Sequence, residues 1–199
     1  MVEHRFKTPV SEEQVRRIKV GDIIYLSGVL YSLRDAGHKR VLEYLGSGKL
    51  LPVSFSGMAV YHMGPVAKRE GGRWRIISAG PTTSARMEDY VAEFIERTGV
   101  RVIVGKGGMG FKTAEACRRF GALYAVFPGG AGALAAKAIE EVEGVEWLDL
   151  GVPEALWVMR VKDFGPLMVV IDAEGNNYYD VVKSQVLKNL KAAYSIVEG

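Results

Sequence analysis

Short apolar runs rich in Ile, Val, Leu and Tyr recur along the chain and predict β-strands. Gly71 and Gly72 lie between two of these runs, which predicts a tight antiparallel hairpin. A further turn is expected over residues 172–175, which read DAEG. The expected strands cover residues 22–31, 58–69, 73–79, 100–104, 123–127, 145–150, 156–161 and 167–171.

Apolar residues at helical spacing predict helices between these strands. Residues 11–14 read SEEQ, and a Ser followed three residues later by Gln is typical of a capping box at a helix start. We expect that first helix to end at Gly21, and Asp35 to cap a second helix through residue 45. Further helices are expected over residues 82–98, 112–120, 134–142 and 181–196, the last one amphipathic.

Strands and helices alternate from residue 100 to residue 150, and this alternation predicts parallel strands joined by right-handed crossovers. The hairpin at Gly71 and Gly72 places antiparallel strands earlier in the chain. No linker, repeat or low-complexity segment interrupts the pattern. We therefore expect one mixed α/β domain over residues 1–199.

Composition narrows the class of protein. The chain has 199 residues, 48% of them hydrophobic, which excludes a disordered or fibrous protein. Cys117 is its one cysteine and cannot by itself form an internal disulfide, a thiolate zinc site or an iron–sulfur cluster; we interpret it as a packing residue. A net charge of +3 from scattered basic residues argues against nucleic-acid binding. Without a secretory signal or membrane span, a cytoplasmic location is expected.

Residues 105–110, GKGGMG, fit the pattern G-x-G-x-x-G between a predicted strand and a predicted helix. A dinucleotide site also needs an acidic residue roughly 20 positions later, where this chain reads AVFPGG. Lys106 places a positive charge inside the loop. Three interpretations stay open: a nucleotide site, a turn that only packs a helix on a sheet, and a site for a small anion, which we favour.

Three predicted strand-to-helix junctions share one composition. They read LRDAGH, GPTTSAR and GKGG, and each carries one cation: Arg34, Arg86 or Lys106. Backbone N–H groups at such junctions favour anions, so the three cations are expected to clamp a dianion, with Gly105 and Gly107 lining the third turn. The alternative for each arginine is an ordinary surface ion pair.

Polar residues at the first two junctions suggest further chemistry. His38 lies one helical turn after Asp35, so the two side chains could hydrogen-bond, and His38 is either a structural donor or a catalytic group; His62 and His4 are weaker candidates. Thr82 and Thr83 are first of all N-cap candidates. Cations and helix N–H groups nearby could also stabilise a threonine alkoxide.

The segments SGVLYSLRDAGHKR, SAGPTTSARM and VGKGGMG, in this order, resemble the β subunit or C-terminal half of class I fumarate hydratases and the related tartrate dehydratases. PGGAGALAAKAI and PEALW extend the likeness over most of the chain. The resemblance implies a swivelling β/β/α fold. It also implies a site shared with an α subunit that holds a [4Fe-4S] cluster through three cysteines.

The resemblance further assigns roles to individual residues. Arg34, Arg86 and Lys106 match the family's carboxylate-binding cations, Thr82 matches its proposed base, and His38 matches a histidine of its first motif. It implies reversible hydration of fumarate to malate by a hetero-oligomer in which this chain also self-associates, without nucleic-acid or membrane partners. The substrate-binding set is expected to include Asp35, Thr83, Gly105 and Gly107.

Two departures bear on substrate choice. Gly37 stands where the family pattern has Ala, and Ser84-Ala85 stand where it has Ala-Gly. Fumarate and tartrate differ by hydroxyl groups, and a polar pocket can discriminate strongly on that basis, so tartrate is an alternative substrate. A phosphate- or nucleotide-binding protein and a non-catalytic interaction protein are two further functions compatible with the sequence.

Overall fold

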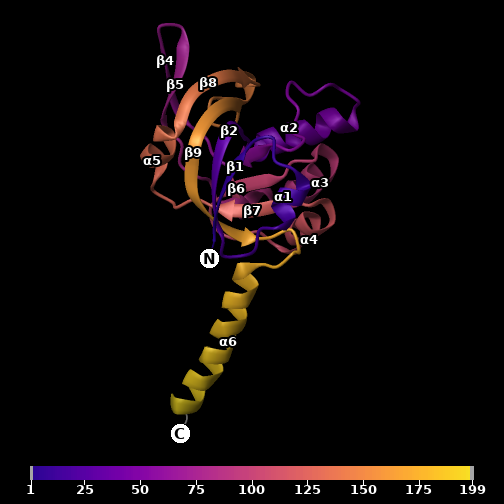
Figure 1. Ribbon diagram of the computed structural model, residues 1–199, viewed down its shortest axis with the longest axis vertical. Helices are drawn as coiled ribbons and strands as arrows, with labels where there is room; N and C mark the ends of the chain where they lie inside the picture. Colours follow the sequence, from indigo (N-terminus) through magenta and orange to yellow (C-terminus); the bar gives the residue numbers. More distant parts are fainter. Residues whose placement is uncertain (1, 198–199) are drawn as a thin grey trace.

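Seven strands form one mixed sheet at the centre of the computed structural model, which describes residues 2–197 and the side chains of residues 2–190 (Figure 1). The strand order is β1-β2-β3-β6-β7-β9-β8, and the first five of these strands are parallel to one another. Strand β9 runs antiparallel to β2, β7 and β8. The bounds are β1 Glu3–Lys7, β2 Ile23–Ser32, β3 Ala59–Tyr61, β6 Val102–Gly105, β7 Leu123–Val126, β8 Ile139–Glu146 and β9 Leu156–Ile171.

The sheet curls so far that one strand, β9, pairs with both β7 and β2. Strand β9 pairs with β7 through Tyr124 and Ile171, and it pairs with β2 along most of its length, so β2, β3, β6, β7 and β9 close on one another. Phe164 and Tyr61 pack against each other inside this curled sheet, with ring centroids 5.1 Å apart and ring planes tilted by 55°. The concave side thus forms one apolar core.

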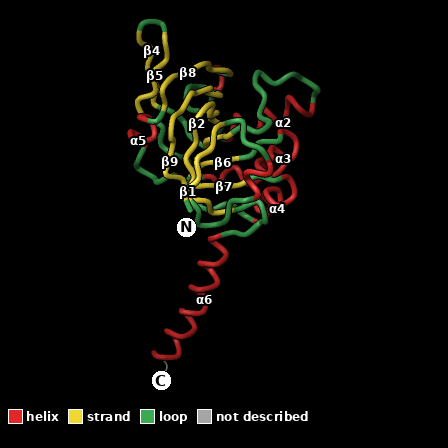
Figure 2. Tube along the Cα trace, in the orientation of Figure 1, coloured by secondary structure: helices red, strands yellow, loops and turns green. Residues whose placement is uncertain are grey.

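Helices cover the opposite side of the sheet. Figure 2 shows α2 (Asp35–Gly46), α3 (Glu88–Thr98) and α4 (Phe111–Phe120) together on that side. They bury a second core that includes Phe94 and Ile95 of α3. Helix α6 (Tyr178–Val197) instead projects away from the body of the protein (Figure 1).

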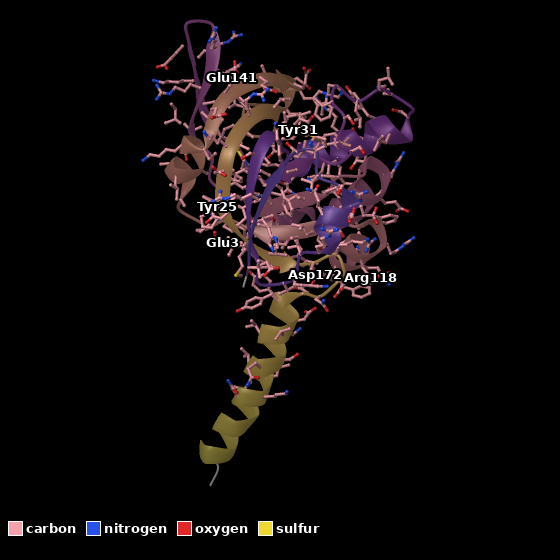
Figure 3. The ribbon with its side chains drawn as sticks, viewed as in Figure 1. Glu3, Tyr25, Tyr31, Arg118, Glu141 and Asp172 are labelled. Carbon is pink, nitrogen blue, oxygen red and sulfur yellow. The ribbon has the colours of Figure 1, made fainter. Side chains whose placement is uncertain are left out.

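Several local expectations are confirmed. The capping box forms at Ser11 and Gln14, although the helix it opens, α1 (Glu12–Arg16), is shorter than expected. Strands β4 (Val66–Glu70) and β5 (Arg73–Ser78) form the expected antiparallel hairpin around two glycines with φ of +56° and +82°. The turn at residues 172–175 is also present, and Asp172 lies beside α4 near Arg118 (Figure 3).

The region after β7 corrects the expected fold. The helix expected over residues 134–142 is the shorter α5 (Gly132–Lys137), and the strand β8 follows it directly. Residues 148–150 form a 3₁₀ turn and not the end of a strand. Because β8 pairs antiparallel with β9, the second expected parallel crossover is wrong.

Two further strand expectations are corrected. Residues 58–69 divide into β3 and β4, because β3 joins the central sheet while β4 leaves it for the hairpin. The strands expected at 156–161 and 167–171 are one strand, β9, which continues through a local irregularity at Asp163, a residue with φ of +48°. Parallel pairing of β1, β2 and β3 also replaces the early antiparallel arrangement, apart from the hairpin. The swivelling type of fold stays a prediction.

Candidate active site

The parallel strands β2, β3, β6 and β7 end at one edge of the sheet, so the loops that follow them lie together. Arg34 follows β2, His62 follows β3 and Lys106 follows β6. Ligands of α/β proteins usually bind at the carboxyl ends of the parallel strands, in closed sheets as in open ones. The first and third sequence junctions therefore meet where such a site is expected.

Main-chain hydrogen bonds bring the second junction to the same edge. The Thr82 N–H donates to the His62 carbonyl at 2.7 Å, and the Ser84 N–H donates to the Lys106 carbonyl at 3.0 Å. Thr83 and Lys106 also form an isolated parallel bridge. The backbone thus holds the threonine segment against the GKGGMG loop, although more than 20 residues separate them in sequence.

Two of the three predicted cations form ion pairs within the chain. Arg86 Nη2 lies 2.8 Å from Asp35 Oδ2, and Arg34 Nε lies 3.1 Å from Glu154 Oε1. Lys106 has no carboxylate partner among the side chains of residues 2–190. Both arginine pairs are partly exposed. In this structure each arginine therefore forms an ion pair at the protein surface, as the alternative interpretation expects. Lys106 remains available to bind an anion.

The expected role of Asp35 as a helix cap is wrong. Asp35 is the first residue of α2, and Arg34 takes the N-cap position without a side-chain capping hydrogen bond. The carboxylate of Asp35 contributes instead by its charge in the first turn and by its contact with Arg86. The N–H of Ala36 donates to Glu154 at 3.0 Å, so Glu154 serves the start of this helix.

His38 does not bond to Asp35 within its turn. Its Nε2 lies 3.1 Å from Nε2 of His62, and Nδ1 of His62 lies 2.9 Å from Oγ of Ser84. All three side chains are fully buried. Burial lowers the pKa of His38 to about 3, and burial together with the neighbouring His38 holds the pKa of His62 well below its ordinary value.

His62 and Ser84 are the residues that sequence reasoning missed. His62 is a weak candidate in the sequence because a lone histidine in an apolar strand is usually a core residue. Ser84 stands out there only as a departure from a family pattern. That departure is the available signal, because a hydroxyl at a position where Ala is expected needs a partner when it is buried.

The two threonines do not cap a helix through their side chains. A 3₁₀ turn at residues Ser84–Met87 precedes α3, and Thr83 takes its N-cap position without a side-chain hydrogen bond. Thr83 is exposed, whereas Thr82 is half-buried. Thr83 therefore occupies an N-cap position but lacks the expected side-chain hydrogen bond, and the hydroxyl of Thr82, one residue earlier, is not committed to a cap.

Both predicted loop glycines are required by the structure, Gly105 by a close side chain and Gly107 by its backbone conformation. A Cβ atom on Gly105 would lie 1.8 Å from Oγ of Ser84, so no side chain fits there. Gly107 has φ of +76°, a conformation that glycine adopts without strain. Tyr124 donates its hydroxyl hydrogen to the Gly107 carbonyl at 2.8 Å and fixes the loop from below.

The N-terminus of α4 already binds a carboxylate of the same chain. Glu88 accepts hydrogen bonds from the N–H of Gly110 at 2.7 Å, from the N–H of Thr113 at 3.2 Å and from the Thr113 hydroxyl at 2.8 Å. These are the donors that a pyrophosphate would use in a dinucleotide site. The arrangement argues against the nucleotide interpretation of the GKGGMG loop.

The residues at this edge do not fit a metal or cluster site. Cys117 lies fully buried in α4, where burial raises the pKa of its thiol. Within residues 2–190, no group of three or more His, Cys, Asp or Glu side chains is arranged to hold a metal ion.

The described part of the chain also contains no helix long and apolar enough to cross a membrane.

Together, the sheet and its edge define a mixed α/β protein with cationic side chains and N–H groups gathered after parallel strands. Comparison with known proteins narrows this class. A family model described as fumarase C-terminus matches residues 2–182. The chain therefore belongs to the fumarase C-terminus family, which confirms the resemblance seen in its motifs.

Relatives within this family cover most of the chain. The L(+)-tartrate dehydratase subunit beta of Escherichia coli (strain K12) is 50% identical over 85% of this chain and 83% of its own length. A putative L(+)-tartrate dehydratase subunit beta of Methanocaldococcus jannaschii is 42% identical over 91% of this chain and 93% of its own length. A putative fumarate hydratase class I of Geobacillus stearothermophilus is 42% identical over 92% of this chain but only 35% of its own length.

Proposed function

We propose that this chain is the β subunit of a hydro-lyase that adds water to fumarate, or removes it from malate, in complex with an α subunit. Family membership and the names of its relatives support the class of enzyme and the existence of a partner subunit. The single observation that carries the proposal is the meeting of the Thr82 segment with Lys106 and Arg34 at one carboxyl edge.

The proposed chemistry needs positive charge at this edge. Removing a proton next to a carboxylate accumulates negative charge on a substrate that is already a dianion, and fixed cations lower the barrier by stabilising that charge. Lys106, which lacks a carboxylate partner among residues 2–190, takes one carboxylate. Arg34 and Arg86 exchange part of their contact with Glu154 and Asp35 for the substrate.

Thr82 is the proposed base. Its hydroxyl does not cap a helix, and its N–H donates a hydrogen bond to the His62 carbonyl. The backbone that carries the side chain is therefore fixed in place. Neighbouring cations favour the alkoxide form in a site closed to water. His38, proposed from its motif, is fully buried and cannot contact the substrate directly, so its contribution is confined to holding its neighbours.

The [4Fe-4S] cluster of the proposal belongs to the α subunit. The described residues of this chain offer no cluster ligands, and Cys117 lies in the core. A cluster with one open iron would supply Lewis-acid chemistry to the hydroxyl and carboxylate of the substrate. The acid for the leaving hydroxyl is likewise assigned to the partner, and this chain also self-associates within the proposed hetero-oligomer.

Tartrate is the second candidate substrate. It is favoured by the 50% identity to the E. coli L(+)-tartrate dehydratase subunit beta, which exceeds the 42% identity to the putative class I fumarate hydratase. The two reactions share the elimination of water from a hydroxy-diacid. They therefore require the same cations and the same base from this chain.

The test is to assemble this chain with its α subunit under anaerobic conditions and to measure turnover of malate, fumarate and L(+)-tartrate. Thr82→Val preserves shape but removes the hydroxyl, so kcat should fall by orders of magnitude with a modest change in KM. Preferred turnover of tartrate would reassign the substrate. Normal turnover by Thr82→Val would remove Thr82 as the base, and turnover by this chain alone would contradict the shared site.

A further inference from the structure

His62 contacts the proposed catalytic segment at two points. Its main-chain carbonyl accepts the Thr82 N–H at 2.7 Å, and its imidazole Nδ1 lies 2.9 Å from Oγ of Ser84. Its own N–H donates to the Val104 carbonyl in β6 at 2.7 Å. One residue thus ties the Thr82–Ser84 backbone to the strand that leads into the GKGGMG loop.

A second histidine extends this contact to α2. Nε2 of His38 lies 3.1 Å from Nε2 of His62, and the His38 ring packs edge-on against Phe94 with centroids 4.7 Å apart. His38 lies one turn after Asp35, which pairs with Arg86 at the far end of the same segment. The segment from Thr82 to Arg86 is therefore held at both ends by α2 and β3.

The hydrogen-bond directions follow from the burial of both rings. The two histidines are neutral because burial lowers the pKa of each. Nδ1 of His38 has no partner within the described residues, and a buried N–H left without an acceptor costs more than a bare lone pair. His38 Nε2–H therefore donates to His62, and His62 Nδ1–H donates to Ser84, an assignment made from the bonding pattern.

Ser84 has no room to move away from this donor. A Cβ on Gly105 would lie 1.8 Å from Oγ of Ser84 and 3.3 Å from Cβ of His62. The hydroxyl thus sits between the His62 ring and the bare backbone of Gly105. The Ser84 N–H also donates to the Lys106 carbonyl. Fixing Ser84 therefore fixes the spacing between the threonine segment and the lysine loop.

We propose that His62, acting through Ser84, is a positioning residue that sets the Thr82–Arg86 segment against Lys106 for the reaction. The proposal rests on the proposed function. Neither side chain reaches the substrate, because both are fully buried. Their effect is on geometry, and displacement of reacting groups by about 1 Å can lower a rate on the order of 100-fold.

The decisive variant is Ser84→Ala in the assembled enzyme, which keeps the backbone and removes only the hydroxyl. It places the alanine of the family pattern beside a His62 that in this chain donates to Ser84, so the expected loss is specific to a chain that carries this serine. We expect kcat to fall about 10- to 100-fold while KM changes less than about threefold. Thr8→Val is the matched control, because Thr8 is a buried residue whose hydroxyl donates to the Val29 carbonyl at 2.8 Å, away from this edge. It should lose comparable thermal stability and keep its kcat.

A rescue series separates positioning from simple stability. His62→Asn retains a donor at the Nδ1 position, whereas His62→Leu has none, so the asparagine variant should keep more kcat than the leucine variant at equal folded concentration. If the leucine variant fails to fold, Ser84→Ala against Thr8→Val decides the question. Normal kcat in Ser84→Ala, or an equal fall in Thr8→Val, would overturn the proposal.

The variant Thr82→Val tests the proposed base independently of the positioning role of His62 and Ser84. If Thr82 is the base and Ser84 acts through it, adding Ser84→Ala to Thr82→Val should lower kcat no further. Normal turnover in Thr82→Val together with a fall in Ser84→Ala would remove the base and keep the positioning role. Full additivity of the two losses would show that Ser84 does not act through Thr82 and would overturn the route proposed for His62.

Discussion

The two glycine-rich loops at the carboxyl edge start alike and lead to different structures. Residues 105–110 follow β6 and open the ten-residue α4, which returns the chain to a parallel strand. Residues 128–132 follow β7 and open the six-residue α5, after which β8 runs antiparallel to β9. Glycines after a strand therefore do not by themselves produce a parallel crossover.

The difference lies in what holds each loop. The first loop is fixed by Glu88, by Tyr124 and by Asn177, whose amide donates to the Met109 carbonyl at 3.0 Å. In the second loop, residues 128–130 are exposed. Helix α4 buries Thr113, Ala114, Ala116 and Cys117, whereas α5 buries only Gly132 and Ala135. The long, capped α4 is thus followed by a strand that is parallel to β6, whereas the short α5 is followed by β8, which joins the same sheet antiparallel to β9.

The largest expected effect comes from adding one methyl group to each loop. Gly105→Ala places a Cβ 1.8 Å from Ser84 Oγ, and overpacking of this kind should lower the free energy of unfolding by about 3 kcal/mol or more. Gly129→Ala meets only the flexible Cδ of Lys106 at 3.3 Å and should cost little. Urea unfolding of both variants checks this, and equal losses would remove the contrast between the loops.

The histidines behind the first loop predict acid sensitivity. His38 stays neutral in the folded chain to about pH 3, while in the unfolded chain it binds a proton below about pH 6.5, so stability is complete above that value and falls with falling pH. The loss for His38 alone is about 2 kcal/mol between about pH 6.5 and pH 5.

Unfolding measured across this range should show a shallower pH slope in His38→Leu than in the unaltered chain. His62 contributes in the same direction, because its pKa is also lowered. An unchanged slope in the variant would mean that His38 is protonated without cost in the folded protein. The second glycine loop, residues 128–132, contains no histidine, so substitutions there should leave the slope unaltered.

The sequence predicted local features better than long-range ones. The capping box at Ser11 and the hairpin at Gly71 depend on neighbouring residues, and both are confirmed. The first half of β8 resembles a helix in the sequence because its register shifts, at residues 139–141 and 142–144, accompany partly buried apolar residues that lie three positions apart. A bulged strand therefore imitates helical spacing.

In the candidate site, too, local features were predicted from the sequence and long-range contacts were not. The sequence pointed to three junctions, and the parallel sheet brings their backbones to one edge. It could not supply the partners of each side chain, because Glu154 and His62 are distant in sequence from Arg34 and His38. Contacts of this kind depend on which strands are neighbours, and periodicity does not contain that information.

An intermediate effect is expected from the cap on the first loop. Glu88→Ala removes the acceptor for two backbone N–H groups and one hydroxyl at the start of α4, which should cost about 1.5 kcal/mol. Asp89→Ala is the matched control, because Asp89 is the next residue, is largely exposed and, among the side chains of residues 2–190, pairs only with the exposed Lys112. Similar melting temperatures for the two variants would show that Glu88 is not a functional cap.

The smallest effect is expected at Thr83, where the first loop is held by backbone and not by side chain. Thr83 pairs with Lys106 through the main chain, its side chain is exposed, and its hydroxyl makes no capping hydrogen bond. Thr83→Val should therefore change the free energy of unfolding by less than about 0.5 kcal/mol, well below the roughly 1 kcal/mol that loss of a true threonine cap costs. Turnover of the assembled enzyme should also stay near normal, in contrast to Thr82→Val. A loss of about 1 kcal/mol would show that the Thr83 hydroxyl forms a capping hydrogen bond to the 3₁₀ turn in solution. A fall of kcat by orders of magnitude would instead assign the role of base to Thr83 and not to Thr82.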